Sequence, residues 1–219
     1  PVLEPAITQT FDSAFQPMVQ PIPGLTDADG NPLEQVQSWT LSDARALLSL
    51  LQGIASEGLS PADYELGKLS AALATGEGRQ LNEAASQSFS WLIEDLRDGR
   101  TPMDARKQWF VVDPDRDRLP TVKIMADALA SHDIAGVVDM LAPDHPDYDA
   151  LKQALAEARA PEPAVVSLAA DYDAEATSPE LDQEAKAERI KMIRANMDRW
   201  RWLARDLGPQ YLMTNVPEY

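Results

Sequence analysis

Apolar residues that recur every three or four positions constrain the fold of this chain more than any other feature of its sequence. The first stripe of this kind consists of Ala44, Leu47, Leu48, Leu51, Ile54 and Ala55. Four later stripes share the period: Ala85, Phe89, Leu92 and Leu96; Val122, Met125, Ala126 and Leu129; Ile134, Val137, Val138 and Leu141; and Tyr148, Leu151 and Leu155. Such spacing places the residues on one face of an α-helix. The sequence therefore predicts a mainly α-helical chain.

Residues 1–40 carry a different pattern. Six prolines and the turn-forming Asp29-Gly30-Asn31 leave little room for helix, so we expect an irregular lead-in. Strand signal is limited to residues 109–112, 164–168 and 211–216. The last of these predicts a terminal strand with nothing later in the chain to pair with.

The organisation that follows is a helical body over residues 41–160, a linker rich in Pro, Glu, Asp and Ala over 161–177, and a long helix over 178–207 that returns to the body. Residues 208–219 form a last segment. We expect one shared core, made of Ala44, Leu47, Leu48, Leu51, Ile54, Phe89, Leu92, Leu96, Ile193 and Trp200. Hydroxyl-proline pairs at Ser60-Pro61, Thr101-Pro102 and Ser178-Pro179 are interpreted as helix starts.

Composition excludes several classes of function. With 36 acidic and 19 basic residues, the net charge of −17 disfavours nucleic acid as a partner. The absence of cysteine excludes a thiol nucleophile, and two histidines leave little for an imidazole-based site. No run of about 18 apolar residues predicts a transmembrane segment. The chain begins at Pro1 without a leader, and we expect a processed chain.

Three groups of polar residues could carry chemistry, and each has a plainer interpretation. Asp113, Asp115 and Asp117 resemble the start of a calcium loop that lacks its Gly and closing Glu, which favours a solvated turn. The carboxylates of 94, 95 and 98 are interpreted as solvated helix charges rather than an acid/base pair. His145 is interpreted as a loop-packing residue. The sequence predicts no cofactor or metal site.

Residues 189–203 are the most informative stretch, because their apolar side chains do not stay on one face. Trp200 and Trp202 lie about 200° apart on a helix with 100° per residue. Such a helix must be covered on two sides. It is either a central core helix, or one tryptophan packs in the helical body while the other contacts a second domain or partner.

At these residues the chain resembles the N-terminal scaffold region of the large periplasmic murein L,D-transpeptidases. Four segments carry the resemblance: Glu57-Gly58-Leu59-Ser60-Pro61-Ala62-Asp63-Tyr64, Asp95-Leu96-Arg97-Asp98-Gly99-Arg100, residues 143–148, and Asn196-Met-Asp-Arg-Trp-Arg-Trp-Leu203 with the residues 207–217 that follow it. The family's catalytic domain, with its Ser-His-Gly-Cys segment, would lie beyond Tyr219. Its peptidoglycan-binding insertion is replaced by residues 161–177. No catalytic residue of the family therefore has a counterpart in this chain.

The resemblance implies a non-catalytic scaffold in the periplasm. Its partner would be a cysteine L,D-transpeptidase module, in cis or in trans, that makes 3→3 cross-links in the cell wall, with peptidoglycan as a further candidate partner. The implied domain-interface residues are Trp200, Trp202, Tyr211 and Asn215. Residues 208–219 would be the seam to the catalytic domain. Two alternatives remain: a stand-alone helical interaction module, and a carboxylate-dependent glycan hydrolase, which needs two acids across a cleft.

Overall fold

The computed structural model describes residues 21–26, 32–106, 119–161 and 179–203, and it is mainly helical, as predicted. The helices are α1 (Leu41–Gly53), α2 (Leu66–Thr75), α3 (Arg79–Asp98), α5 (Thr121–Ser131), α6 (Gly136–Leu141), α7 (Pro146–Arg159) and α8 (Pro179–Trp200). Short 3-10 turns are η1 (Ile54–Glu57), η2 (Pro61–Tyr64) and η3 (Met103–Ala105). The strands predicted at 109–112, 164–168 and 211–216, and the loop of Asp113, Asp115 and Asp117, lie outside the described residues.

The lead-in contains an element that the sequence analysis missed. Strands β1 (Pro21–Thr26) and β2 (Pro32–Glu34) pair antiparallel, with Pro21 opposite Glu34 and Thr26 opposite Pro32. A two-stranded ribbon has only edge strands, and edge strands tolerate proline because one side of each makes no ladder bonds. The prolines that argue against helix are therefore compatible with this ribbon.

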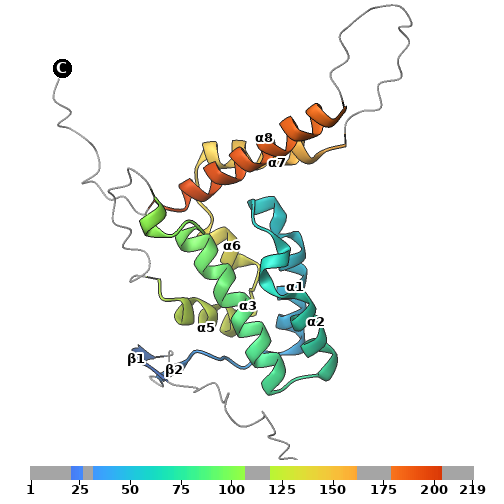
Figure 1. Cartoon of the computed structure of the whole chain (residues 1–219). Helices are drawn as coiled ribbons and strands as arrows, with labels where there is room; N and C mark the ends of the chain where they lie inside the picture. Colours follow the sequence, from blue (N-terminus) through green and yellow to red (C-terminus); the bar gives the residue numbers. More distant parts are fainter. Residues whose placement is uncertain (1–20, 27–31, 107–118, 162–178, 204–219) are drawn as a thin grey trace, which may run out of the picture.

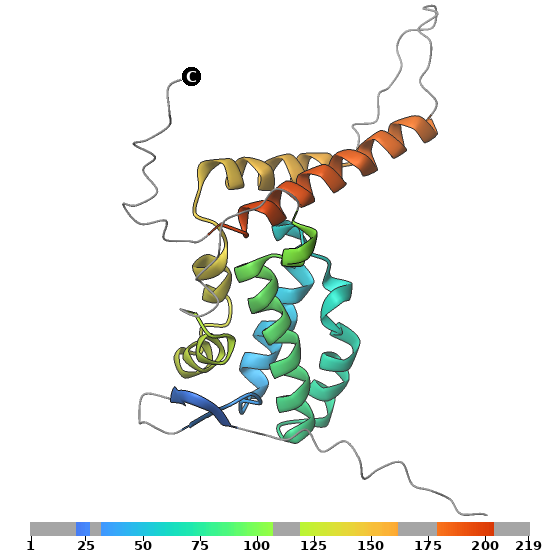
Figure 2. The same cartoon turned by 60° about the vertical axis from the view of Figure 1, so that its left-hand side comes forward.

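Helices α1, α2 and α3 pack side by side and form the body, with α5 and α6 against α3 (Figures 1 and 2). The stripes predicted for α1, α3, α5 and α6 face this core, and Leu47, Leu51, Phe89 and Leu92 have no exposed surface. Thr40 caps α1, because its side chain accepts the N–H of Asp43 at 3.1 Å. The periodicity predicted these helices correctly, since each buries the face that carries the stripe.

Helices α7 and α8 lie side by side across one end of the body (Figure 2). They bury a second cluster, which consists of Tyr148, Leu155, Ala158, Ile193 and Met197, with Trp200 partly buried beside it. The prediction that Ile193 and Trp200 share one core with Leu51 and Leu92 is therefore wrong. The reason is that α8 packs on α7, and α7 covers the apolar face of α8.

None of the described helices is long and apolar enough to cross a membrane.

Candidate functional site

The C-terminal end of α8 meets the body through a set of buried polar contacts, which we call the α8 junction. It joins Glu57 of η1, the turn at residues 99–101 after α3, Tyr148 of α7, and Asp198, Arg201 and Trp202 at the end of α8. Arg201 is only 2% exposed, which is unusual for a guanidinium and indicates a specific environment. The contacts of the junction are described in turn below.

Arg201 sits at the centre of the junction. Its Nη2 donates to the Tyr148 hydroxyl at 2.7 Å and to the Glu57 carbonyl at 2.5 Å. The Tyr148 hydroxyl in turn donates to the Glu57 carboxylate at 2.9 Å, and Lys152 pairs with the same carboxylate at 2.5 Å. Burial, together with the neighbouring charge of Glu57, raises the pKa of Tyr148, so its hydroxyl stays protonated and donates. Glu57, Tyr148, Lys152 and Arg201 thus form one network across three helical elements.

Asp198 connects the other side of α8 to the turn after α3 through hydrogen bonds. Its carboxylate accepts the backbone N–H of Arg100 at 2.6 Å, the Thr101 hydroxyl at 2.6 Å and the Trp202 indole N–H at 3.1 Å. The turn requires Gly99, whose φ is +74° and whose Cβ would lie 2.9 Å from Trp202 Cδ1. The sequence analysis placed Thr101 as the cap of a helix that starts at Pro102, whereas the short turn η3 begins at Met103 and the Thr101 hydroxyl donates to Asp198.

Trp202 is buried, with 8% exposure, against this turn. The Arg106 guanidinium lies 4.9 Å from its ring centroid and also donates to the carbonyl of Thr101 at 2.8 Å. A cation over an indole ring is a favourable contact, the more so when it is desolvated. The Trp202 side chain is therefore covered by the described part of this chain.

Trp200 lies on the opposite side of α8 and is half-buried. It stacks on His145 with ring centroids 4.5 Å apart. His145 also caps α7, because its Nδ1 accepts the N–H of Asp147 at 3.1 Å. Trp200 lines an open hollow of about 570 Å³ between α7 and α8, together with Leu151 and Leu203. The interpretation of His145 as a packing residue agrees with this placement.

Tyr64 and Asp95 form a second polar contact beside the junction. The Tyr64 hydroxyl donates to Asp95 at 2.8 Å, and Arg100 pairs with Asp95 at 3.5 Å and with Asp63. Burial raises the pKa of Asp95, although the hydrogen bond from Tyr64 and the charge of Arg100 oppose this effect. Burial, and next the charge of Asp95, also raises the pKa of Tyr64. Asp95 is thus a structural acceptor.

The carboxylates considered for acid/base chemistry do not converge across a cleft. Glu94 is exposed, Asp95 accepts from Tyr64, and Asp98 pairs with the Arg97 guanidinium at 2.7 Å. In the described ranges, no group of three or more histidine or acidic side chains is placed to hold a metal ion.

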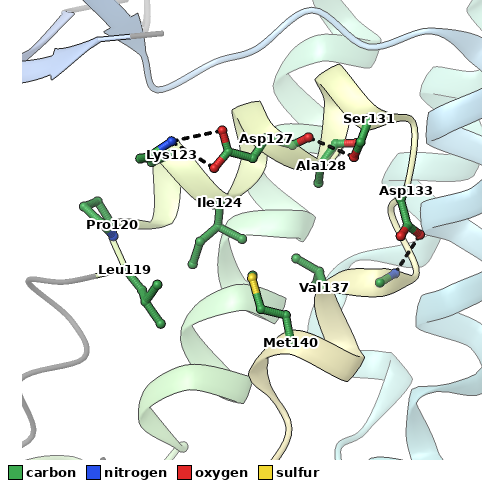
Figure 3. A pocket seen from close by; sticks show the side chains of 11 residues that line it. Leu119, Pro120, Lys123, Ile124, Asp127, Ala128, Ser131, Asp133, Val137 and Met140 are labelled. Carbon is green, nitrogen blue, oxygen red and sulfur yellow. Dashed lines mark hydrogen bonds and ion pairs between the residues drawn. The ribbon is translucent and has the colours of Figure 1, made fainter. Parts of the chain in front are cut away.

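A further hollow, of about 260 Å³, lies between α5 and α6 (Figure 3). Ile124, Val137 and Met140 point into it, while Lys123 and Asp127 pair at its rim. Met140 is 47% exposed. Leu119, which lines the hollow, accepts a hydrogen bond through its carbonyl from Arg97, near the C-terminal end of α3, at 2.7 Å.

The structure brings together some of the residues that the sequence analysis selected. Trp200 and Trp202 flank the end of α8, whereas Tyr211 and Asn215 lie outside the described residues. Glu57, Tyr148 and Arg201 were not selected, although each belongs to a segment that carries the resemblance. The sequence feature that could have identified them is a charged or phenolic side chain within an otherwise apolar helical pattern.

Comparison with protein families matches residues 36–155 to the family described as Scaffold domain. No curated protein and no solved structure matches the chain. The match spans α1 to most of α7 and contains Glu57, Tyr148 and Lys152 of the junction.

Proposed function

We propose a function from one premise: this chain belongs to the Scaffold domain family. The proposal is that it is a non-catalytic scaffold in the periplasm that positions a cysteine L,D-transpeptidase module. That module, in cis or in trans, would make the 3→3 cross-links of peptidoglycan. The thiolate chemistry would belong entirely to the partner, because this chain has no cysteine.

The observation that carries the proposal is the way α8 is held. α8 lies outside the family match, yet Asp198 and Arg201 anchor its end to residues inside the match. Hydrogen bonds between buried or charged groups hold geometry more strictly than apolar contacts do. The end of α8 therefore has a defined position relative to the body, which is what a positioning scaffold needs.

The segments that carry the resemblance also support the proposal. Residues 57–64, 95–100, 143–148 and 196–203 are far apart in sequence, and all four contribute contacts at the α8 junction or directly beside it. A motif set that converges on one place in space indicates a shared structural task. The task inferred here is to hold α8 where the transpeptidase module docks, with Trp200 and its hollow as the contact surface.

The stand-alone interaction module is the second candidate. The observation in its favour is the half-buried Trp200 beside an open hollow, which another protein could fill. This candidate predicts a partner without L,D-transpeptidase activity.

Binding of a purified L,D-transpeptidase catalytic domain to the purified chain separates the two candidates. The proposal expects a complex that Trp200→Ala weakens and that Met192→Ala, an exposed change on the same helix, leaves unchanged. It also expects that the chain alone releases no D-alanine and makes no 3→3 dimer from stem tetrapeptides. Absence of a complex with such catalytic domains, or activity of the chain alone, would overturn the proposal.

A further inference from the structure

Helices α7 and α8, with the residues at their ends, form a unit that has its own apolar packing. We call residues 145–159 and 179–203 the lobe. The buried apolar side chains of the lobe gather in one cluster and those of the body in another, and the two clusters share no residue. The lobe lies across the end of the body where α1 and α3 finish (Figure 2). Each unit therefore has a core that does not require the other.

The hydrogen bonds between the lobe and the body centre on two short segments of the body. The first is residues 55–58, whose backbone carbonyls accept from three side chains of the lobe: Arg159, Arg194 and Arg201. The second is residues 99–106, where Asp198 accepts from the backbone and from a hydroxyl. Met197 and Trp202 add apolar contact at these segments. Water can replace the polar contacts when the two units separate, because backbone carbonyl and N–H groups are readily hydrated.

The buried charges of the α8 junction fix its geometry but add little net stability. Glu57 and Arg201 are 3% and 2% exposed, so both lose almost all of their hydration when the lobe packs on the body. Such desolvation offsets much of the attraction between buried charges. The Nε of Arg201 is also buried without a hydrogen-bond partner among the described residues, and hydration would remove this cost. Separation of the lobe from the body should therefore require less free energy than unfolding of the chain.

The hollow at Trp200 belongs entirely to the lobe. Its lining comes from α7, from α8 and from Leu203, which lies just beyond α8. The stacking partner of Trp200 is His145, which also belongs to the lobe. No residue of the body lines the hollow. The hollow therefore keeps its shape if the lobe moves as a whole.

We propose that the lobe is a rigid arm that releases from the body at the α8 junction and carries the Trp200 hollow to a new orientation. The junction then has two states: its hydrogen bonds are formed in one, and its polar groups are hydrated in the other. The inference goes beyond the proposed function and does not depend on it, because the movement requires no partner.

The test is measurement of distances between pairs of spin labels on the whole chain by double electron–electron resonance. The chain has no cysteine, so labels attach only at introduced ones. Gln87→Cys in α3 with Glu184→Cys in α8 reports the position of the lobe relative to the body, and Asp149→Cys in α7 with Glu184→Cys reports the lobe itself. All three positions are exposed. In the parent chain each pair should give one main distance.

Variants of the junction should change only the first of these distances. Tyr148→Phe removes the hydroxyl that joins Glu57 to Arg201 and keeps the ring in its apolar cluster. It should raise the fraction of a second distance between lobe and body about tenfold, and Arg201→Gln should raise it further. Tyr64→Phe is the matched control, because it removes a similar hydrogen bond to Asp95 within the body. It should leave both distances as in the parent chain.

Three results would overturn the proposal. An unchanged distance between lobe and body in both junction variants would show that the junction does not hold the lobe. A broadened distance within the lobe would show that the lobe melts instead of moving as a unit. An equal effect of Tyr64→Phe would trace the change to a general loss of stability. If Arg201→Gln does not fold, Tyr148→Phe, which keeps the aromatic ring, decides the test.

Discussion

The Asp198 carboxylate accepts the backbone N–H of Arg100 at 2.6 Å, although 98 positions separate the two residues in the sequence. This contact closes α8 onto the end of α3. Asp198 also takes the Thr101 hydroxyl and the Trp202 indole N–H, so one side chain holds three points of the junction.

Asp198→Asn should destabilise the chain by about 1.5 to 3 kcal/mol. The amide has one acceptor oxygen instead of two, and its hydrogen bonds lose the strength that the negative charge of the carboxylate adds. Urea unfolding measures this change. Asp127→Asn is the matched control, since Asp127 makes an exposed pair with Lys123 on one helix, and it should cost less than about 0.5 kcal/mol. Equal effects of the two substitutions would contradict the role of Asp198.

Gly99→Ala should also destabilise the junction. The new Cβ would lie 2.9 Å from Trp202 Cδ1 at a backbone φ of +74°, which costs about 1 to 3 kcal/mol in backbone strain alone. Gly67→Ala is the control, because its Cβ would meet nothing within 4 Å and the residue lies in α2. There the change should stabilise by up to about 1 kcal/mol. A tolerated Gly99→Ala would mean that Trp202 does not pack on this turn.

The division into two apolar clusters predicts additive core substitutions. Leu51→Ala in the body and Leu155→Ala between α7 and α8 should each cost about 2 to 5 kcal/mol, since both side chains are buried. The double variant should lose the sum to within about 0.5 kcal/mol, because the residues share no cluster. Met192→Ala, at 60% exposure, should change stability little. A coupling energy between the two substitutions well above about 0.5 kcal/mol would indicate one continuous core instead.

Asp95 should give a pH dependence of definite sign. Its pKa is raised above the ordinary value of 3.8, chiefly by burial, so the folded state favours the protonated carboxyl. The stability gained from protonated Asp95 is therefore fully present below pH 3.8, and it is lost as the pH rises through the folded-state pKa of Asp95. Asp95→Asn should therefore gain stability relative to the parent chain between about pH 4 and pH 7. A relative loss over the same range, measured by urea unfolding, would mean that Arg100 and Tyr64 lower the pKa instead.

Much of the body could be predicted from the sequence. Helix periodicity is a local property, and the stripes of α1, α3, α5, α6 and α7 needed no knowledge of the partner that covers them. The opposite placement of Trp200 and Trp202 also predicted that the end of α8 is covered on two sides. In the structure, His145 covers one side, and Gly99 with Arg106 covers the other.

The rest depends on contacts between distant segments. The separation of Ile193 from the main core follows from the pairing of α8 with α7, which no local pattern encodes. Thr101 fits a helix start by spacing, but its hydroxyl binds Asp198, 97 positions away. An arginine is usually exposed to solvent, so the sequence alone does not indicate that Arg201 is buried. The hydrogen bonds to the Tyr148 hydroxyl and the Glu57 carbonyl explain its burial.

The most direct test of the scaffold account is the yield of 3→3 cross-linked muropeptides, measured by chromatography and mass spectrometry. The reaction would contain tetrapeptide donors and an L,D-transpeptidase catalytic domain joined after Tyr219 of this chain. The account predicts cross-links from the joined protein, a marked loss with Gly99→Ala, and parental yield with Gly67→Ala. It also predicts that the chain without the catalytic domain makes none. Equal yields from the joined protein, the Gly99→Ala variant and the isolated catalytic domain would contradict it.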